Sequence, residues 1–339
     1  MTPRERVLKA LNCEEPDRVP FMDYFNTSVQ RDLMGRNDFT FAEFARKIDM
    51  DGIYFTDYVA PVFCKSHTGE DGATQGDMAR GEIEFLGEGL IRTEKDLRLM
   101  QFPNADDESY YDAAKRFVDQ FGNEDLALYA AMRPLGLFNV IFSMPMIDFS
   151  RALLTNVGLI NTMMDMYVEW NCKVIEKLQG TGIDFILANC DMAFKTGPLL
   201  SPKHFREIFL PKMKIIADTI KIPWVFHSDG DLNLVLEDLL TLGMNAINPF
   251  EPPVMDIAAI KKKYGHKICL WGNIDLVYTL TLGTPEEVDE EVRQRIREIG
   301  PGGGYICASA NSITPYCKKE NIYAMLNAIK KYGAYPINC

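Results

Sequence analysis

The chain has 339 residues, of which 47% are hydrophobic and 25% charged, and its formal net charge is −12. This composition is typical of a globular protein with enough apolar material for a large core. The acidic balance, without a concentrated basic face, argues against a nucleic-acid partner and against a polyanionic substrate. No apolar run reaches the roughly 18 residues needed to span a bilayer, and the charged segment 1–6 does not resemble a signal peptide. We therefore expect a cytoplasmic protein without a membrane partner.

Helical patterns with clear start signals alternate with short apolar runs. Thr2-Pro3-Arg4-Glu5 has the spacing of a capping box with proline at the first helical position, and Thr284-Pro285-Glu286-Glu287 repeats it. Eight apolar runs read as buried strands. They are 19–25, 52–59, 126–132, 184–190, 223–226, 246–250, 268–271 and 305–308.

Strict alternation of strands and helices predicts a parallel sheet with right-handed crossovers, and eight strands favour a closed (β/α)₈ TIM barrel of the α/β class. We expect one domain over residues 1–339. The stretch 63–125 is long and weakly patterned, so it is interpreted as an insertion after the second strand. It contains a predicted hairpin at 81–93 and is expected to cover the barrel mouth.

Polar side chains follow almost every predicted strand. Because barrel enzymes carry their chemistry at the carboxyl ends of the strands, this convergence predicts a site. The residues are Asp23, Tyr24, Asn26, Asp57, Arg133, Asn189, Cys190, Asp191, His227, Asp229, Glu251, Asn273, Asp275, Cys307, Ser309 and Asn311.

The segment His227-Ser228-Asp229 is the centre of this predicted site. Its His and Asp are two residues apart, so they point to the same side of an extended chain. Such a pair could be a general acid and base, or two ligands of a divalent metal; a hydrogen-bonded structural histidine is the alternative. Asp191 could orient His227, act as an acid, bind substrate or cap its loop. Glu251 is presented between prolines and is expected to join the site.

Two further features bear on substrate binding. Cys307 shares the strand parity of Asn311, which predicts that it lines the site, whereas Cys190 is expected to face the core. The apolar segment 135–146, which includes Phe138 and Met144, could line a hydrophobic substrate, form a docking surface or belong to the core. The eight cysteines contain no CxxC pair, and most are expected to be reduced core thiols.

Several motifs together resemble the uroporphyrinogen decarboxylase superfamily, and they cover nearly the whole chain. The resemblance implies a (β/α)₈ barrel, in agreement with the eight predicted strands. The motifs are 2–7 (TPRERV), 15–20 (EPDRVP), 227–230 (HSDG), 272–275 (GNID), 283–288 (GTPEEV) and 320–322 (ENI).

One chemistry of this superfamily is the cofactor-free decarboxylation of uroporphyrinogen. Its true members resemble one another in an Arg-rich segment after the first strand, which handles the carboxylates of the substrate. Here residues 21–27 read FMDYFNT, with acidic and aromatic groups instead. This departure, with the negative net charge, disfavours the porphyrin reaction.

The other chemistry is methyl transfer to or from a corrinoid protein. Members that methylate thiols carry zinc on a His-x-Cys pair after the fifth strand and on a Cys after the eighth. Alignment on Glu320-Asn321-Ile322 places Asn311 where the last Cys stands, and Asp229 falls at the first Cys, so that only His227 is kept. These oxygen donors are harder metal ligands than the thiolates that they replace. The resulting set could bind zinc or another divalent ion, or act without metal as a proton donor.

The resemblance implies a corrinoid-dependent methyltransferase, which moves a methyl group from a small donor such as a methyl ether to a cobalamin-type corrinoid on a partner protein, by O-demethylation. The alternatives are a cofactor-free decarboxylase and a non-catalytic binding protein; a homodimer is left open. The expected catalytic residues are His227, Asp229 and Asp191, and the expected metal ligands are His227, Asp229 and Glu251. Those expected to bind substrate are Tyr24, Asn26, Asp57, Arg133, Phe138, Met144, Glu251, Tyr305, Cys307 and Asn311.

Overall fold

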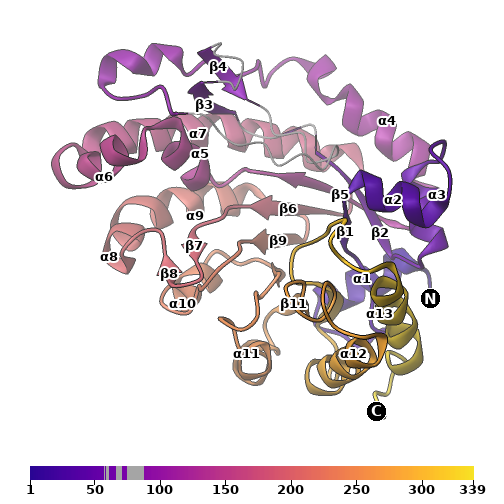
Figure 1. Ribbon diagram of the computed structural model, residues 1–339. Coiled ribbons are helices and arrows are strands. Elements are labelled where there is room, and N and C mark those ends of the chain that lie inside the picture. The colour runs from indigo at the N-terminus through magenta and orange to yellow at the C-terminus, as the bar shows by residue number, and fades with distance from the viewer. Residues whose placement is uncertain (57, 59–60, 66–70, 75–87) are drawn as a thin grey trace.

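The computed structural model describes residues 1–56, 58, 61–65, 71–74 and 88–339 (Figure 1). A curved sheet of seven strands has the order β12-β11-β10-β9-β6-β5-β2, and its neighbouring strands are parallel. Each strand overlaps a predicted one, so the predicted α/β barrel class is confirmed. The strands are β2 (Gly52–Phe55), β5 (Ala127–Met132), β6 (Phe185–Asn189), β9 (Trp224–His227), β10 (Ala246–Asn248), β11 (Cys269–Ile274) and β12 (Tyr305–Ser309).

The first predicted strand lies in the gap between β12 and β2. Phe21 forms a parallel bridge with Cys307 on β12, and the backbone N–H of Asp51, just before β2, donates to the Phe21 carbonyl at 2.8 Å. Further along, β1 (Tyr24–Phe25) pairs in parallel with β13 (Ser312–Ile313). The chain therefore joins the two edges of the sheet, as eight predicted strands require.

Alternate residues of each strand belong to two separate hydrophobic clusters. The inner cluster fills the barrel, where the ring of Tyr129 stacks on that of Phe185 with centroids 4.5 Å apart. Helix α1 (Pro3–Leu11) adds three side chains to it. The N–H of Arg4 donates to the carbonyl of Asp125, just before β5, so α1 closes the barrel at the amino ends of the strands. The opposite end is left for the site.

The outer cluster packs the sheet against the helices. The capping boxes predicted at Thr2 and Thr284 are both present, at the starts of α1 and α12. The α-helices that follow α1 are α2 (Thr27–Met34), α3 (Phe41–Lys47), α4 (Asp112–Phe121), α5 (Leu137–Ser143), α6 (Met146–Thr155), α7 (Val157–Leu178), α8 (Pro202–His204), α9 (Leu210–Thr219), α10 (Leu236–Leu240), α11 (Ile257–Tyr264), α12 (Pro285–Ile299) and α13 (Lys319–Tyr332).

The stretch 63–125 contains helix α4 as well as irregular chain. Its antiparallel pair is β3 (Val62–Lys65) with β4 (Asp71–Thr74). Most of the hairpin predicted at 81–93 lies outside the described residues. Among the helices described, none alone is long and apolar enough to cross a membrane; α5 and α6 would pass only as a pair, with a bend of 111° between them.

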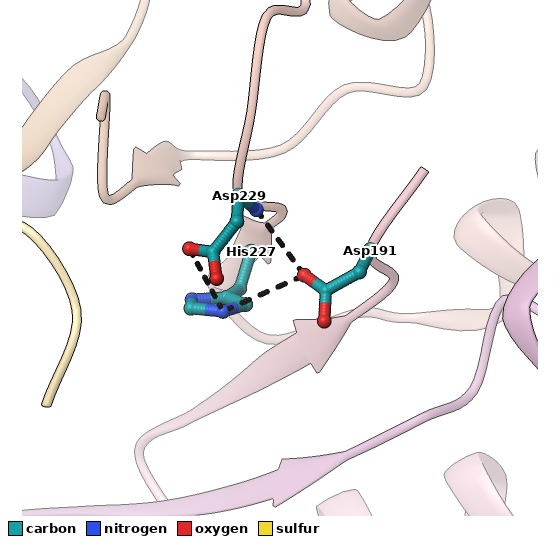
Figure 2. Close-up of side chains that lie close together, drawn as sticks. All are labelled: Asp191, His227 and Asp229. Atoms are coloured by element: carbon teal, nitrogen blue, oxygen red, sulfur yellow. Dashed lines mark hydrogen bonds and ion pairs between the residues drawn. The ribbon is translucent and has the colours of Figure 1, made fainter. Parts of the chain in front are cut away.

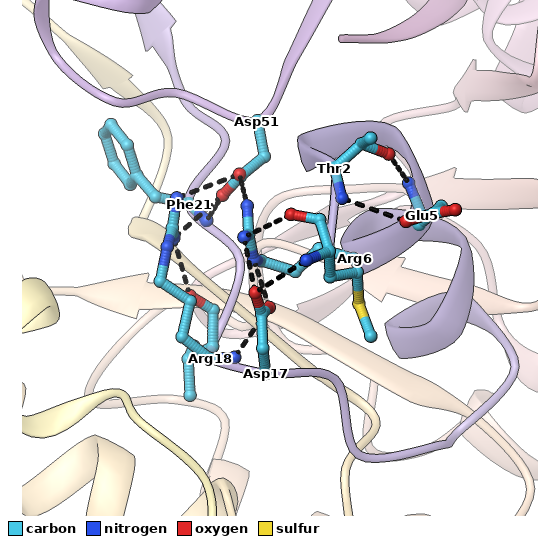
Figure 3. Close-up of polar contacts among 9 residues, drawn as sticks. Thr2, Glu5, Arg6, Asp17, Arg18, Phe21 and Asp51 are labelled. Carbon is cyan, nitrogen blue, oxygen red and sulfur yellow. Dashed lines mark hydrogen bonds and ion pairs between the residues drawn. The ribbon is translucent and has the colours of Figure 1, made fainter. Parts of the chain in front are cut away.

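A buried ionic cluster fixes α1 to the start of β2 (Figure 3). Asp51 is fully buried, and its Oδ1 accepts from Arg6 at 2.5 Å and from Arg18 at 2.9 Å. Its Oδ2 accepts from the backbone N–H of Phe21 at 2.7 Å, while Arg6 also pairs with Asp17 at 2.7 Å. One carboxylate thus holds three chain segments together at the closed end of the barrel.

A second buried carboxyl group joins the first and last strands at the open end. Asp23 accepts from the backbone N–H of Ser309 at 2.7 Å, from its Oγ at 2.9 Å and from the N–H of Tyr24 at 2.8 Å. Burial raises the pKa of Asp23 from 3.8 to about 7, because these donors only partly replace water around the carboxylate.

The raised pKa predicts a pH dependence of stability. The folded chain keeps a proton on Asp23 that the unfolded chain has already lost above its lower pKa, so the associated stabilisation is lost as the pH rises toward about 7. The loss between pH 5 and pH 8 is about 3 kcal/mol. Asp23→Asn carries no such charge, and urea melts at both values should show a smaller decrease in its free energy of unfolding. Equal decreases in the two proteins would contradict this.

Candidate functional site

Three polar side chains meet where β6 and β9 end (Figure 2). His227 is the last residue of β9 and its side chain is 12% exposed; Asp229 follows it, and Asp191 follows β6. The imidazole Nε2 lies 3.8 Å from Asp191 Oδ1 and 4.0 Å from Asp229 Oδ1. The N–H of Asp229 donates to Asp191 at 3.1 Å, which holds the two loops together.

These three residues could hold a metal ion. Among the residues that the structure describes, Asp191, His227 and Asp229 form the group whose ligand atoms all lie within 4.8 Å of one another. They offer one nitrogen and two carboxylate oxygens, a donor set that suits zinc or a harder divalent ion. The donors therefore fit a divalent cation.

Asp229 has the most unusual environment of the three. Its Oδ2 accepts from Asn311 at 2.6 Å, but its Oδ1 is buried without a hydrogen-bond partner among the described residues. Burial raises the pKa of Asp229 to about 6; His227 and Asn311 oppose this change, while Asp191 and Glu251 add to it. A buried carboxylate oxygen without a partner is costly unless a cation or a proton occupies the adjacent space.

Glu251, a predicted metal ligand, lies outside this set. Its Oε2 accepts from the N–H of Gly230 at 3.2 Å, and its Oε1 pairs with Lys195 at 2.8 Å. Lys195 stands at the turn between β7 (Ala193–Phe194) and β8 (Gly197–Pro198). Both oxygens of Glu251 are thus engaged, and the structure places Asp191 in the cluster instead.

Two of the site's neighbours, Lys195 and Asn248, were not predicted from the sequence. Lys195 reaches Glu251 only because its hairpin folds over the end of β9, and Asn248 contacts His227 only because β10 pairs with β9. The residue opposite His227 in that register is Asn248. Parallel alignment of the two predicted runs 223–226 and 246–250 would place Asn248 beside His227.

Arg133 and Phe138, both predicted to bind substrate, lie together after β5, with the guanidinium 4.8 Å from the ring centroid. Tyr24 packs against the inner cluster, and its ring lies 4.8 Å from that of Tyr54. Asn26 caps α2, its side chain accepting from the Ser28 N–H. These side chains therefore have packing or capping partners of their own.

Other predicted residues do not join the cluster. Met144 lines a separate pocket of about 530 Å³, together with Arg92 and Asp148. Asp57 lies outside the described residues.

Tyr305 and Cys307 are fully buried in the outer cluster, which also contains residues of α12. They alternate along β12 with Ile306 and Ala308, which face the barrel interior. Burial raises the pKa of Cys307 to about 12. The alternation of side chains that was used to place Cys307 on the same side as Asn311 does not extend to Asn311, because β12 ends at Ser309.

Gly230 allows the His227–Asp229 loop to pass close to the β7–β8 hairpin. Its φ is +86°, and a Cβ there would lie 2.6 Å from the Ala193 carbonyl oxygen. Gly243, with φ +84°, has no atom of a described residue other than its chain neighbours within 4 Å of its own Cβ position. The two glycines share a backbone conformation but differ in their surroundings.

We expect Gly230→Ala to destabilise the fold more than Gly243→Ala. A left-handed alanine costs about 1–2 kcal/mol at either position, and the clash at Gly230 adds about 1–3 kcal/mol. Urea denaturation of the two variants measures this difference. Equal losses would mean that the hairpin moves away freely.

A (β/α)₈ barrel with polar side chains gathered at the carboxyl ends of its strands has the architecture of a TIM-barrel enzyme. Residues 74–332 match the family model of uroporphyrinogen decarboxylase (URO-D). The chain therefore belongs to the uroporphyrinogen decarboxylase family, and the resemblance seen in its motifs is confirmed.

Curated relatives of two activities match parts of the chain. It is 27% identical over 176 residues to uroporphyrinogen decarboxylase of Pseudoalteromonas translucida, covering 48% of each chain. It is 28% identical over 136 residues to the methylcobamide:CoM methyltransferase MtaA of Methanosarcina barkeri, covering 40% of this chain and 39% of that protein. The chain thus spans about half or less of the length of these relatives.

Among solved structures, a methyltransferase from Methanosarcina mazei superposes with a TM-score of 0.70 at 18% identity, over 98% of this chain and 99% of that one. This likeness shows that the two proteins have the same fold.

Proposed function

We propose that the protein is a methyltransferase that moves a methyl group from a small donor, such as a methyl ether, to a corrinoid carried by a partner protein. The observation that carries the proposal is the cluster of Asp191, His227 and Asp229 at the mouth of the barrel. The similarity to MtaA supports it. The fold shared with the Methanosarcina mazei protein is compatible with it.

The reaction sets the task of the site. The bond between the methyl carbon and the donor oxygen breaks, both electrons stay on the oxygen, and the methyl group passes to the reduced corrinoid, which supplies the electron pair of the new bond. An alkoxide or phenoxide is a poor leaving group unless a proton or a Lewis acid neutralises its charge. The protein therefore has to bring positive charge to that oxygen.

The residues for this task are Asp191, His227 and Asp229, which we propose as ligands of one divalent cation. A cation bound there would act as a Lewis acid on the leaving oxygen. Nε2 of His227 faces both carboxylates, and the unpartnered Oδ1 of Asp229 supports the same assignment. Asn311 holds the other oxygen of Asp229 in place.

Glu251 and Lys195 form the rim of the site. Their ion pair keeps Glu251 against the N–H of Gly230, and the Lys195 side chain remains more than half exposed. We propose that Tyr24, Arg133 and Phe138 bind the donor, since they lie at or just after the carboxyl ends of their strands, the end of the barrel that carries the cluster.

Methyl transfer to chemically reduced cobalamin, followed by absorbance, tests the proposal. A panel of methoxylated aromatics, aliphatic methyl ethers and methylamines should contain at least one donor that gives methylcobalamin. No transfer from any donor, with zinc supplied and with free cobalamin at high concentration, would count against it.

A decarboxylase is the second candidate, because relatives named uroporphyrinogen decarboxylase match the chain as well as MtaA does. The net charge of −12 and the two aspartates of the cluster are poorly suited to a substrate with many carboxylates. Release of carbon dioxide from a carboxylated substrate, without any corrinoid, would favour this reading.

A further inference from the structure

Asn248 lies against the side of His227 that faces away from the two aspartates. It is the last residue of β10, is 3% exposed, and stands opposite His227 in the parallel register. Its Oδ1 is 2.5 Å from His227 Nδ1, and its Nδ2 donates to the backbone carbonyl of Trp271 at 3.1 Å.

The Trp271 carbonyl determines which way the Asn248 amide is turned. A carbonyl oxygen can only accept a hydrogen bond, so the amide nitrogen must face it and the amide oxygen must face the imidazole. An amide oxygen cannot donate, and therefore Nδ1 of His227 carries the proton of this hydrogen bond. In the neutral ring the lone pair is then on Nε2, which points toward Asp191 and Asp229.

We propose that Asn248 is a positioning residue that holds His227 in its Nδ1–H tautomer, so that Nε2 is the nitrogen offered to a cation between Asp191 and Asp229. The assignment of the cation rests on the proposed function, whereas the tautomer follows from the hydrogen bonds alone. Metal-bound histidines are generally oriented by such a partner on the other ring nitrogen.

The proposal explains why the carboxylates do not select the opposite tautomer. Carboxylate oxygens lie 3.8 and 4.0 Å from Nε2, and both favour a proton on that atom. A proton on Nε2 would block the lone pair needed by a cation. Asn248 opposes it, because Nδ1 without a proton would face the amide oxygen at 2.5 Å, with two lone pairs in contact.

Asn273 offers a matched control. It is also a buried asparagine on the neighbouring strand β11, but its Nδ2 donates to the Phe250 carbonyl at 2.8 Å and not to a residue of the cluster. Asn273→Leu removes a buried amide of the same kind, from a position without a hydrogen bond to His227 among the described residues.

The test is nitrogen NMR of the metal-free protein labelled with ¹⁵N-histidine, at about pH 8.5, above the ordinary pKa of histidine. The chain has only four histidines, so His227→Ala assigns the signal. We expect the Nδ1–H tautomer in the wild type and in Asn273→Leu, and the Nε2–H tautomer in Asn248→Leu. Asn248→Asp should keep Nδ1–H, because a carboxylate still accepts from Nδ1.

Zinc affinity, measured by competition with a chelating dye, gives a second readout. It should fall at least about tenfold in Asn248→Leu and much less in Asn248→Asp. An Nε2–H tautomer in the wild type would overturn the proposal even if Asn248→Leu failed to fold, and so would an unchanged tautomer in a folded Asn248→Leu. The predicted tautomers without any zinc binding would support the positioning role and overturn the proposed cation site.

Discussion

His227→Ala should lower methyl transfer by about 10³-fold and should abolish tight zinc binding. The substitution removes the one nitrogen ligand of the cluster and leaves Asp191 and Asp229 without the group that faces both of them. The measurements are the initial rate with reduced cobalamin and the best donor of the panel, and the zinc content after dialysis.

The matched control is His266→Ala, because His266 is exposed at the turn after α11. This variant should keep the wild-type rate and zinc content. A His227→Ala protein that retains full activity would contradict the proposed function. If His227→Ala loses the native circular dichroism spectrum, its loss of activity reflects unfolding. His227→Gln then replaces it, because glutamine keeps a polar side chain of similar length, and this variant should be equally inactive.

Asp51→Asn should lower the free energy of unfolding by about 3 kcal/mol, since it removes the buried carboxylate that pairs with two arginines and leaves Arg6 with Asp17 as its remaining ion-pair partner among the described residues. The amide cannot balance the charges of Arg6 and Arg18, both of which bind the Asp51 carboxylate in the native chain. The NH₂ group that Asp51→Asn introduces would also be a hydrogen-bond donor at a position where the two guanidinium groups and the Phe21 N–H already donate. Urea denaturation at neutral pH measures the effect.

Asp49→Asn is the control for this prediction, two residues earlier in the chain. Asp49 forms an exposed ion pair with Lys330, and pairs of that kind contribute less than about 1 kcal/mol. Its φ of 54° is a left-handed conformation that asparagine tolerates. Equal stability of the two variants would mean that the Asp51 cluster is no stronger than a surface pair.

Much of the barrel could be predicted because its strands are buried on both faces. Such strands read as apolar runs, and β5 and β6 are examples in which nearly every residue is buried. The helix starts at Thr2 and Thr284 were predictable for a local reason, since a capping box is complete within four residues.

The site could be predicted only in part, because it depends on contacts between strands and loops. The spacing of His227 and Asp229 predicted that they lie on one side of the chain, and Figure 2 shows the two side chains next to each other. The cluster contains Asp191 and not Glu251, whose carboxylate is engaged in an ion pair with Lys195. That pair depends on the fold of the β7–β8 hairpin, which periodicity does not encode.

The direction of side chains at the end of β12 illustrates the same limit. Tyr305 and Cys307 were expected to line the site, but in β12 these two side chains point outward, toward α12. The alternation of side chains along a strand predicts that Cys307 and Ile306 face opposite sides of the sheet. It does not predict which of the two sides is the barrel interior. The neighbouring helix, which covers one face only, decides that.

The proposed function depends most directly on the binding of one divalent cation by Asp191, His227 and Asp229. Equilibrium dialysis against zinc, with elemental analysis of the protein, measures this. We predict one tightly bound ion per chain in the wild type, and loss of that ion in Asp229→Asn and in His227→Ala. A wild-type protein that binds no zinc tightly, or an Asp229→Asn protein that keeps its ion, would contradict the proposed cation site.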